Sequence, residues 1–420
     1  MAPRDPVGSF AAAMDQLLRA THLNAPDQLP DIAAGAARRL GATEAFLYLI
    51  DYEQVVLTPL PVGGTVSSRP ALSVDSTLAG RAFRTVEAVE SDAGASRRLW
   101  IPLLDGVERL GVLELVIAAE GRELTSVERS NCTQFAHMVA ELLVSNSLYT
   151  DSYEWARRRE PMTLAAEMQH WLLPPLTFGT NRVVISGLLA PAYEVGGDAY
   201  DYALNGNIAH VAMFDAVGHG LQASVLANMA VSCYRNCRRA GLDIAATALE
   251  IDTVIDTMFG SERYVTAILG QLDIDTGLLR WMNAGHPQPM LLRDSQVIKQ
   301  LECEPLLPLG LNAMAGKAAD RITDDLVCQE SLEPGDRILL LTDGVDEART
   351  EDGEFFGRTR LAEFAARESA SGLPTPEVMR RLQQAVLRHQ TGRLQDDATT
   401  LFVEWLTAQP DHLIPGDASR

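Results

Sequence analysis

The sequence predicts an α+β (mixed α-β) multidomain fold: a sheet-and-helix domain, a helical linker, and a second domain of strands and helices. Its 420 residues are about two to three times the usual size of one domain. A helical pattern of about thirty residues begins near Thr125. From Arg182 onward, short apolar runs alternate with turns rich in Gly and Asp, which is typical of strands. The chain is therefore expected to divide into a first domain (1–150), a linker (151–175), a second domain (176–407) and a polar tail (408–420).

In the first domain, alternation of apolar stretches with turn residues predicts a sheet between helices. Asp105-Gly106 is a hairpin signal between two apolar strands. The predicted elements, in chain order, are helices over 8–20 and 30–40, strands over 45–51 and 54–57, a loop around 63–70, a helix over 76–83, and strands over 99–104 and 111–118.

The long helix that follows begins with a capping box, since Thr125 is followed three residues later by Glu128. Its apolar positions continue to Trp155. Helices of this length commonly join domains or pair with a second copy, so we expect a homodimer, although a helix lying on its own domain is the alternative. After Pro161, an amphipathic stretch over 163–173 ends at a pair of prolines.

Composition and charge exclude several classes of protein. Hydrophobic residues make up 47% and charged residues 22%, as in ordinary globular proteins. Acidic residues outnumber basic ones by 56 to 35, and the net charge of -21 repels nucleic acid and anionic membrane surfaces. No apolar run approaches the roughly 20 residues of a membrane span, and the N-terminus lacks a signal-peptide pattern. These features predict a cytoplasmic protein.

The cysteines are five in number, which is odd, and we expect all of them to be structural. Cys233 and Cys237 share a helix face and could hold a metal. No His or further Cys pair accompanies them, so small buried thiols are the favoured interpretation.

Four acidic segments of the second half, which also contains predicted helices over 221–239 and 243–259, carry the candidate chemistry. Each places an Asp beside Gly or another Asp at the edge of a predicted strand. The segments are Glu194–Asp201, His210–Gly220, Arg337–Gly344 and Asp396–Val403. One such motif alone is usually a turn. Converging carboxylates suit Mg²⁺ or Mn²⁺, and two such ions can activate water for phosphoryl transfer.

The second half resembles the SpoIIE-like branch of the PPM metal-dependent protein serine/threonine phosphatases, over about residues 182–405. The resemblance rests on the ordered segments GGDAYD, DAVGHGLQAS, YVTAILGQLDIDTGLLRWMNAGHPQP, LLLTDGVDEAR and DDATTLFV. It implies a sandwich of two antiparallel β-sheets flanked by helices, with two Mn²⁺ or Mg²⁺ ions at one end. The implied ligands are Asp198, Asp215, Asp343 and Asp396, with Asp215 bridging both ions, and the backbone carbonyl of Ala216.

Further residues have roles that follow from this resemblance and from residue chemistry. Asp201 and Asp397 are expected to support the ligands. His219 and His286 could protonate a leaving group, or each could brace a loop through hydrogen bonds. We expect Asp215, Asp343 and His219 to be the catalytic residues.

The implied reaction is hydrolysis of phosphoserine or phosphothreonine by a metal-activated water, without a phosphoenzyme. No Cys-x5-Arg loop supports a cysteine mechanism. No Arg aligns with the phosphate-binding Arg of the eukaryotic branch, so the resemblance leaves phosphate recognition unassigned. The implied substrate is a phosphorylated STAS-fold anti-sigma-factor antagonist. The alternative is a pseudophosphatase, or a ligand-binding regulator, that acts by binding partners.

Residues from about 27 to 150 resemble a GAF domain, with a PAS domain as the alternative. The resemblance rests on AFLYLI, the segment around Ser76–Phe83, and the strands LWIPL and GVLEL. It implies a sensor that binds an unknown small molecule or protein and signals through its exit helix. In relatives, the segment matching Ala166–Pro174 can act as a regulatory switch, and a fixed linker is the alternative.

Overall fold

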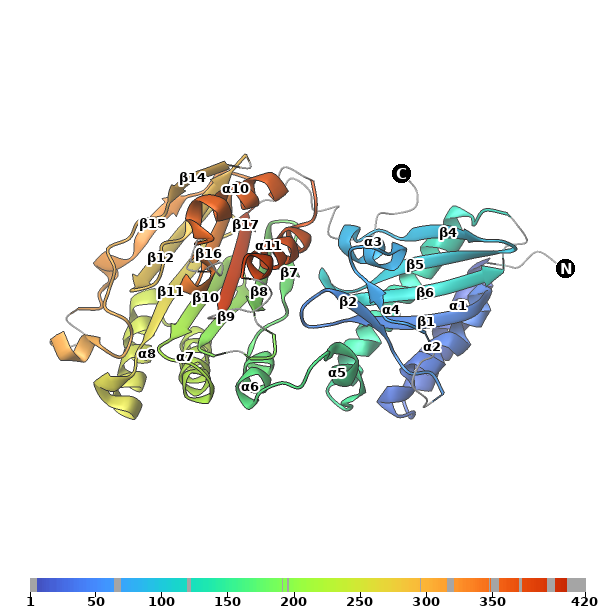
Figure 1. Cartoon of the computed structure of the whole chain (residues 1–420), viewed down its shortest axis with the longest axis horizontal. Coiled ribbons are helices and arrows are strands. Elements are labelled where there is room, and N and C mark those ends of the chain that lie inside the picture. Colours follow the sequence, from blue (N-terminus) through green and yellow to red (C-terminus); the bar gives the residue numbers. More distant parts are fainter. Residues whose placement is uncertain are drawn as a thin grey trace. The chain divides into compact units, whose positions relative to one another are not determined.

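The structure is a computed structural model of the chain (Figure 1). It describes residues 6–63, 69–118, 122–190, 192–194, 196–294, 296–315, 321–346, 348, 355–369, 372–390 and 397–405. The chain forms two compact units, which divide between Glu160 and Pro161. The mixed helix-and-sheet multidomain prediction is confirmed. The segment predicted as a separate linker is shared between the two units.

The first unit is built on one six-stranded antiparallel sheet with strand order β3-β2-β1-β6-β5-β4. The hairpin predicted at Asp105-Gly106 joins its two longest strands. The strands are β1 (Ala42–Ile50), β2 (Val56–Pro59), β3 (Leu72–Ser73), β4 (Val89–Ala93), β5 (Ser96–Asp105) and β6 (Glu108–Ala118).

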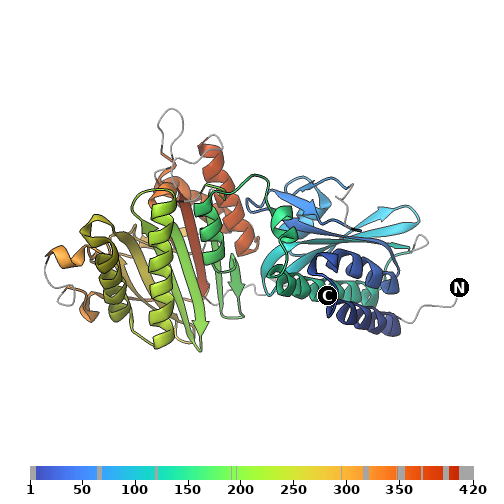
Figure 2. The same ribbon diagram turned by 90° about the horizontal axis from the view of Figure 1, so that it is seen from below.

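Helices cover both faces of this sheet because buried apolar side chains alternate along its strands. On β1, Leu47 and Leu49 join a core that they share with several helices, whereas Tyr48 and Ile50 pack with α3 (Leu78–Thr85) on the opposite face. The first core includes residues of α1 (Pro6–Thr21), α2 (Leu29–Ala37), α4 (Ser126–Ser147) and the short α5 (Ser152–Arg157). Figure 2 shows α1, α2 and α4 together on one side of the sheet.

The predicted thirty-residue helix is wrong in length. Its capping box forms, but α4 ends at Ser147 and α5 (Ser152–Arg157) begins after a break. The buried Tyr153 explains the break, because its hydroxyl donates to the carbonyl of Pro26 at 2.5 Å and ties α5 to the first unit. The next helix, α6 (Leu164–Leu172), packs on α7 (Leu221–Ala240) of the second unit.

The second unit contains two antiparallel sheets, with strand orders β15-β12-β11-β10-β9 and β14-β13-β16-β17-β8-β7. Their bounds are β7 (Thr177–Gly179), β8 (Val183–Ala190), β9 (Asp198–Asn205), β10 (Ile208–Ala216), β11 (Val265–Asp273), β12 (Leu278–Ala284), β13 (Met290–Arg293), β14 (Gln296–Gln300), β15 (Cys328–Ser331), β16 (Arg337–Leu341) and β17 (Ala398–Trp405).

A shared hydrophobic cluster lies between these sheets. It includes Tyr200 and Met213 from the five-stranded sheet and Ile185 and Leu401 from the six-stranded sheet. The outer face of the five-stranded sheet packs against α7 (Leu221–Ala240) and α8 (Ile244–Phe259). The other outer face packs against α9 (Asp343–Asp346), α10 (Gly357–Ser369) and α11 (Thr375–His389). Short 3-10 helices are η1 (Pro26–Gln28), η2 (Arg38–Leu40), η3 (Gly260–Glu262), η4 (Asn312–Ala315) and η6 (Asp324–Leu326).

One disulfide was not anticipated from the sequence. Cys303 and Cys328 are bonded, whereas Cys132, Cys233 and Cys237 are free. The two bonded residues belong to segments that fold together although they are 25 positions apart. None of the helices in the described ranges is both long and apolar enough to cross a membrane.

Candidate active site

Asp198 and Asp215 face each other across neighbouring strands. Antiparallel pairing places Asp198, the first residue of β9, directly opposite Asp215, near the end of β10. Asp215 in turn lies opposite Thr266 on β11. Because directly opposed residues have Cβ atoms about 4.5–5.5 Å apart, the two carboxylates share one end of the five-stranded sheet. We call this end the acid edge.

Thr342 connects the acid edge to the other sheet. Its hydroxyl donates to Oδ2 of Asp198 at 2.6 Å and accepts from the backbone N–H of Thr399 at 2.9 Å. Thr342 directly follows β16, and Thr399 belongs to β17. Since the Thr399 N–H occupies a lone pair of the hydroxyl, the hydroxyl proton is directed at the carboxylate.

The two glycines before Asp198 are required by close contacts. Asp397 Oδ2 accepts from the backbone N–H of Gly196 at 2.6 Å and of Gly197 at 2.8 Å. A Cβ on Gly196 would lie 2.8 Å from that oxygen, and one on Gly197 would lie 2.3 Å from the carbonyl oxygen of Ala216. Side chains at these positions would push Asp397 and Ala216 away, so the Gly-Gly pair allows the acid edge to close.

Electrostatics at the acid edge favour a bound cation. Asp198 is 3% exposed. Burial raises the pKa of Asp198 well above its usual value, and the charges of Asp215 and Asp397 raise it further, against the hydrogen bond from Thr342. Neighbouring carboxylates that cannot all ionise together are stabilised by a divalent ion.

The oxygen donors present fit Mg²⁺ or Mn²⁺. Asp198, Asp215 and the Ala216 carbonyl are hard ligands of the kind that these ions prefer. Asp343 is exposed at the start of α9, next to Thr342. Asp396 lies outside the described residues. Within the described ranges, no three His, Cys, Asp or Glu side chains form a complete metal-binding group.

Comparison with known proteins assigns the second unit to a family. Residues 205–406 match the family model described as Stage II sporulation protein E (SpoIIE). The second unit carries a SpoIIE-family domain. The predicted resemblance to SpoIIE-like phosphatases is thereby confirmed, and the resemblance of the first unit to GAF domains stays a prediction.

Relatives of this SpoIIE-family domain include two proteins of Bacillus subtilis named phosphoserine phosphatases. RsbU is 23% identical over 246 residues, which cover 58% of this chain and 70% of RsbU. RsbP is 26% identical over 174 residues, which cover 39% of this chain and 40% of RsbP. The chain thus matches less than half the length of RsbP. A solved structure, the SiaA-PP2C domain of Pseudomonas aeruginosa, is 23% identical with a TM-score of 0.48, over 57% of this chain and 94% of that domain.

Both histidines predicted for the SpoIIE-family domain lie near its acid edge, in opposite environments. His219 is exposed, in the glycine turn between β10 and α7. His286 is 5% exposed, and its Nδ1 lies 2.8 Å from the hydroxyl of Thr266, the residue opposite Asp215. Burial lowers the pKa of His286 to about 3, against a smaller opposing effect of the Leu341 backbone. His286 is therefore neutral near pH 7, and its contacts brace the loop after β12.

Asp201 does not support the acid edge, contrary to its predicted role. It lies on the opposite face of β9, because the side chains of a strand alternate. Its Oδ1 accepts from Arg235 at 2.7 Å, and its Oδ2 accepts from Arg238 at 2.7 Å. Two arginines of α7 thus compensate its charge, and Asp201 fastens that helix to the sheet.

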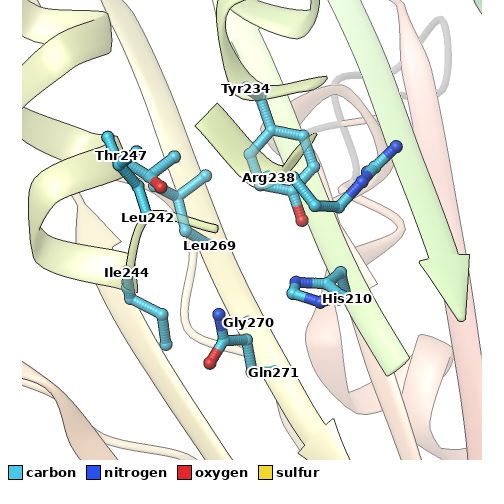
Figure 3. Close-up of a pocket in the computed structure, with 9 residues that line it drawn as sticks. All are labelled: His210, Tyr234, Arg238, Leu242, Ile244, Thr247, Leu269, Gly270 and Gln271. Carbon is cyan, nitrogen blue, oxygen red and sulfur yellow. The ribbon is translucent and has the colours of Figure 1, made fainter. Parts of the chain in front are cut away.

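Arg238 also borders a small pocket on this outer face, away from the acid edge (Figure 3). The pocket is lined by His210, Tyr234, Arg238, Leu242, Ile244, Thr247, Leu269, Gly270 and Gln271. His210 and Asp215 are five residues apart on β10, about 17 Å along the strand. The pocket is therefore separate from the carboxylates.

Sequence reasoning missed Thr342, which contacts Asp198, and Arg263, whose guanidinium approaches the glycine turn. The position of Thr342 just before Asp343 was an available signal. Arg263 stands two residues before β11 and just outside the quoted sequence segments.

Proposed function

We propose that the second unit is a metal-dependent phosphatase that hydrolyses phosphoserine or phosphothreonine in proteins. The observation that carries the proposal is the buried Asp198, which lies directly opposite Asp215 at one end of a SpoIIE-family domain and whose pKa burial and the neighbouring acids raise. The relatives RsbU and RsbP, named phosphoserine phosphatases, support the same reaction.

Asp198, Asp215, Asp343, Asp396 and the carbonyl of Ala216 would hold two Mn²⁺ or Mg²⁺ ions. When bound, such ions activate water and neutralise the charge of the phosphoryl oxygens. The sandwich of two antiparallel sheets that the family resemblance implies would place these ligands at the ends of buried strands.

The chain's own groups position this chemistry. Thr342 fixes Oδ2 of Asp198. Asp397 shapes the Gly-Gly segment that carries Asp198, and Gly197 leaves room for the carbonyl of Ala216. His219, exposed in the glycine turn, can donate a proton to the serine or threonine oxygen that leaves.

The direct test is hydrolysis of a phosphopeptide by the purified full chain with Mn²⁺, with Mg²⁺ and with a chelator. We expect activity with a divalent ion and loss of activity in Asp215→Asn and Asp343→Asn. Asp325→Asn, an exposed acid of η6, is the matched control and should retain the activity. Wild-type protein that is inactive with every divalent ion would contradict the proposal and favour the pseudophosphatase.

The proposed substrate is a phosphorylated STAS-fold anti-sigma-factor antagonist, because the relatives belong to the Rsb group. The test compares kcat/KM for such a phosphoprotein with kcat/KM for a peptide carrying the same phosphoserine. A clear preference for the folded protein supports this substrate class, and equal values contradict it.

The first unit is proposed to be a GAF-like sensor that regulates the phosphatase and supports a homodimer. Helices lie on both faces of its sheet, and Glu114 is fully buried against Tyr48 and Arg98. Exposed Tyr149 and Trp155 offer apolar surface for a second copy.

Glu114→Gln should change the phosphatase rate if this sheet communicates with the site. An unchanged rate, together with a monomer by light scattering, would contradict both proposals.

A further inference from the structure

Arg263 lies beside the acid edge, and none of the carboxylates in the described ranges forms an ion pair with it. Arg263 stands between η3 and β11, two residues before Val265, which pairs with Ala216. The next residue, Tyr264, accepts at its carbonyl the backbone N–H of Val217 at 3.1 Å. The backbone of Arg263 is therefore held close to the turn that follows Asp215.

A second contact braces the segment from the opposite side. Leu309 and Val265 exchange backbone hydrogen bonds of 2.8 and 3.0 Å. Gly310 approaches so closely that a Cβ there would lie 2.9 Å from the carbonyl oxygen of Arg263. Asp252 of α8 accepts the N–H of Gly310 at 2.7 Å. The chain that carries Arg263 is thus fixed on two sides.

The guanidinium of Arg263 lies over the glycine turn. Its Nη2 donates to Oε1 of Gln222 at 2.6 Å, and its Nη1 is 3.5 Å from the position of a Cβ on Gly218. Gly218 has a φ of 97°, so a side chain there would be strained. The turn that carries His219 therefore leaves space for this cation.

The partner of Arg263 is the neutral amide of Gln222, unlike the partners of three buried ion pairs of the second unit. Arg235, Arg238 and Arg293 each pair with a buried Asp, whereas no acidic side chain among the described residues forms an ion pair with Arg263. The side chain is half-exposed. Its charge and remaining N–H donors are free to meet an anion from solvent.

A phosphomonoester needs such a group, because it is an anion that must approach a cluster of carboxylates. Arginine presents N–H donors in a planar fork that matches phosphate oxygens. We propose that Arg263 binds the phosphoryl group of the substrate, and that Gln222 positions its guanidinium. This inference rests on the proposed phosphatase function and assigns its phosphate-recognition residue.

The test measures two quantities on the full chain with Mn²⁺: kcat/KM for a phosphopeptide and the dissociation constant of inorganic phosphate by calorimetry. Loss of a charge-assisted contact should lower kcat/KM about 10- to 100-fold in Arg263→Ala and weaken phosphate binding by a similar factor. Arg263→Lys keeps a positive charge but loses the fork, so it should lie between Ala and wild type. Gln222→Leu should raise KM with a smaller effect than Arg263→Ala.

Arg239→Ala is the matched control. It removes the same charge from an exposed position at the far end of α7 and should leave both quantities unchanged. Mn²⁺ affinity and the thermal midpoint should be the same in wild type and in Arg263→Lys, although phosphate binding is weaker in the variant. If Arg263 had a purely structural role, weaker phosphate binding would be accompanied by a change in one of these two quantities.

The outcomes separate this inference from the proposed function. An active wild type with unchanged kcat/KM and phosphate affinity in Arg263→Lys and Arg263→Ala overturns the role of Arg263 alone. A wild type without turnover whose phosphate binding depends on Arg263 overturns the phosphatase proposal and supports the anion site. A wild type without turnover and without phosphate binding overturns both.

Discussion

Asp198 and Asp201 lie three residues apart on β9, and both are almost completely buried, yet their surroundings are opposite. Asp201 faces α7, where Arg235 and Arg238 compensate its charge. Asp198 faces Asp215 and receives one hydroxyl hydrogen bond. Burial alone therefore does not identify a functional acid. A carboxylate whose charge the protein has already compensated is structural, and one left beside other acids is suited to a ligand cation.

The largest expected effect is on catalysis, and it should separate the two acids completely. Asp198→Asn removes a proposed metal ligand, so phosphopeptide hydrolysis should fall by at least about 100-fold. Asp201→Asn should retain most of the activity per folded molecule, because its side chain points away from the acid edge. Steady-state assays with saturating Mn²⁺ measure both. Equal losses of activity in the two variants would contradict the distinction between a metal-binding Asp198 and a structural Asp201.

The second expected effect concerns stability, and here Asp201→Asn should be the more damaging of the two substitutions. Asp201→Asn leaves two arginines without their carboxylate, and the Arg238 side chain is only 9% exposed. Breaking a buried pair from one side costs about 3–5 kcal/mol of unfolding free energy. Urea unfolding of the metal-free protein measures this loss. Asp275→Asn, which removes an exposed partner of Arg182, is the control and should cost less than about 1 kcal/mol.

A third variant examines what holds Asp198 in place. Thr342→Val deprives Asp198 of its donor and the Thr399 N–H of its acceptor, so it should destabilise the protein by about 1–3 kcal/mol and reduce activity. Thr342→Ser keeps the hydroxyl and should recover most of both losses. If Val and Ser behave alike, the hydroxyl does not position Asp198.

The smallest expected effect comes from His286, a buried group at the acid edge that is neutral instead of charged. Its folded pKa of about 3 lies below the unfolded value of 6.5. The unfolded chain therefore binds more protons between these values, and stability falls as the pH is lowered through 6.5. This group should contribute a loss of about 0.7 kcal/mol from pH 7 to pH 6. Urea unfolding of wild type and His286→Asn at both pH values isolates the difference, and equal slopes would contradict it.

Local signals in the sequence predicted much of the fold. The helix predicted over 221–239 is α7, and the capping box of Thr125 and Glu128 starts α4. The end of α4 was missed because it depends on Tyr153 reaching Pro26, a contact across 127 positions. The disulfide between Cys303 and Cys328 was missed for the same reason, since spacing does not reveal which loops return to each other.

The sequence predicted the site residues that lie at strand ends. It did not predict the residues whose role depends on contacts with distant parts of the chain. Asp198 and Asp215 lie opposite each other, at the strand ends where the sequence suggested they would meet. Asp201 belongs to the same sequence motif, but its side chain lies on the other face of β9 and pairs with two arginines of α7. Both facts depend on the tertiary structure. Arg263 belongs to no motif, and its position beside Gly218 is seen only in the folded structure.

The bond between Asp397 and the N–H of Gly196 joins residues 201 positions apart, and this has a consequence for biosynthesis. Gly196 is synthesised long before Asp397, so the acid edge cannot close until Asp397 has left the ribosome. Domains generally fold as units once their sequence is available. A chain that is released before Asp397 is synthesised therefore lacks the hydrogen bonds that hold the Gly-Gly segment in front of Asp198.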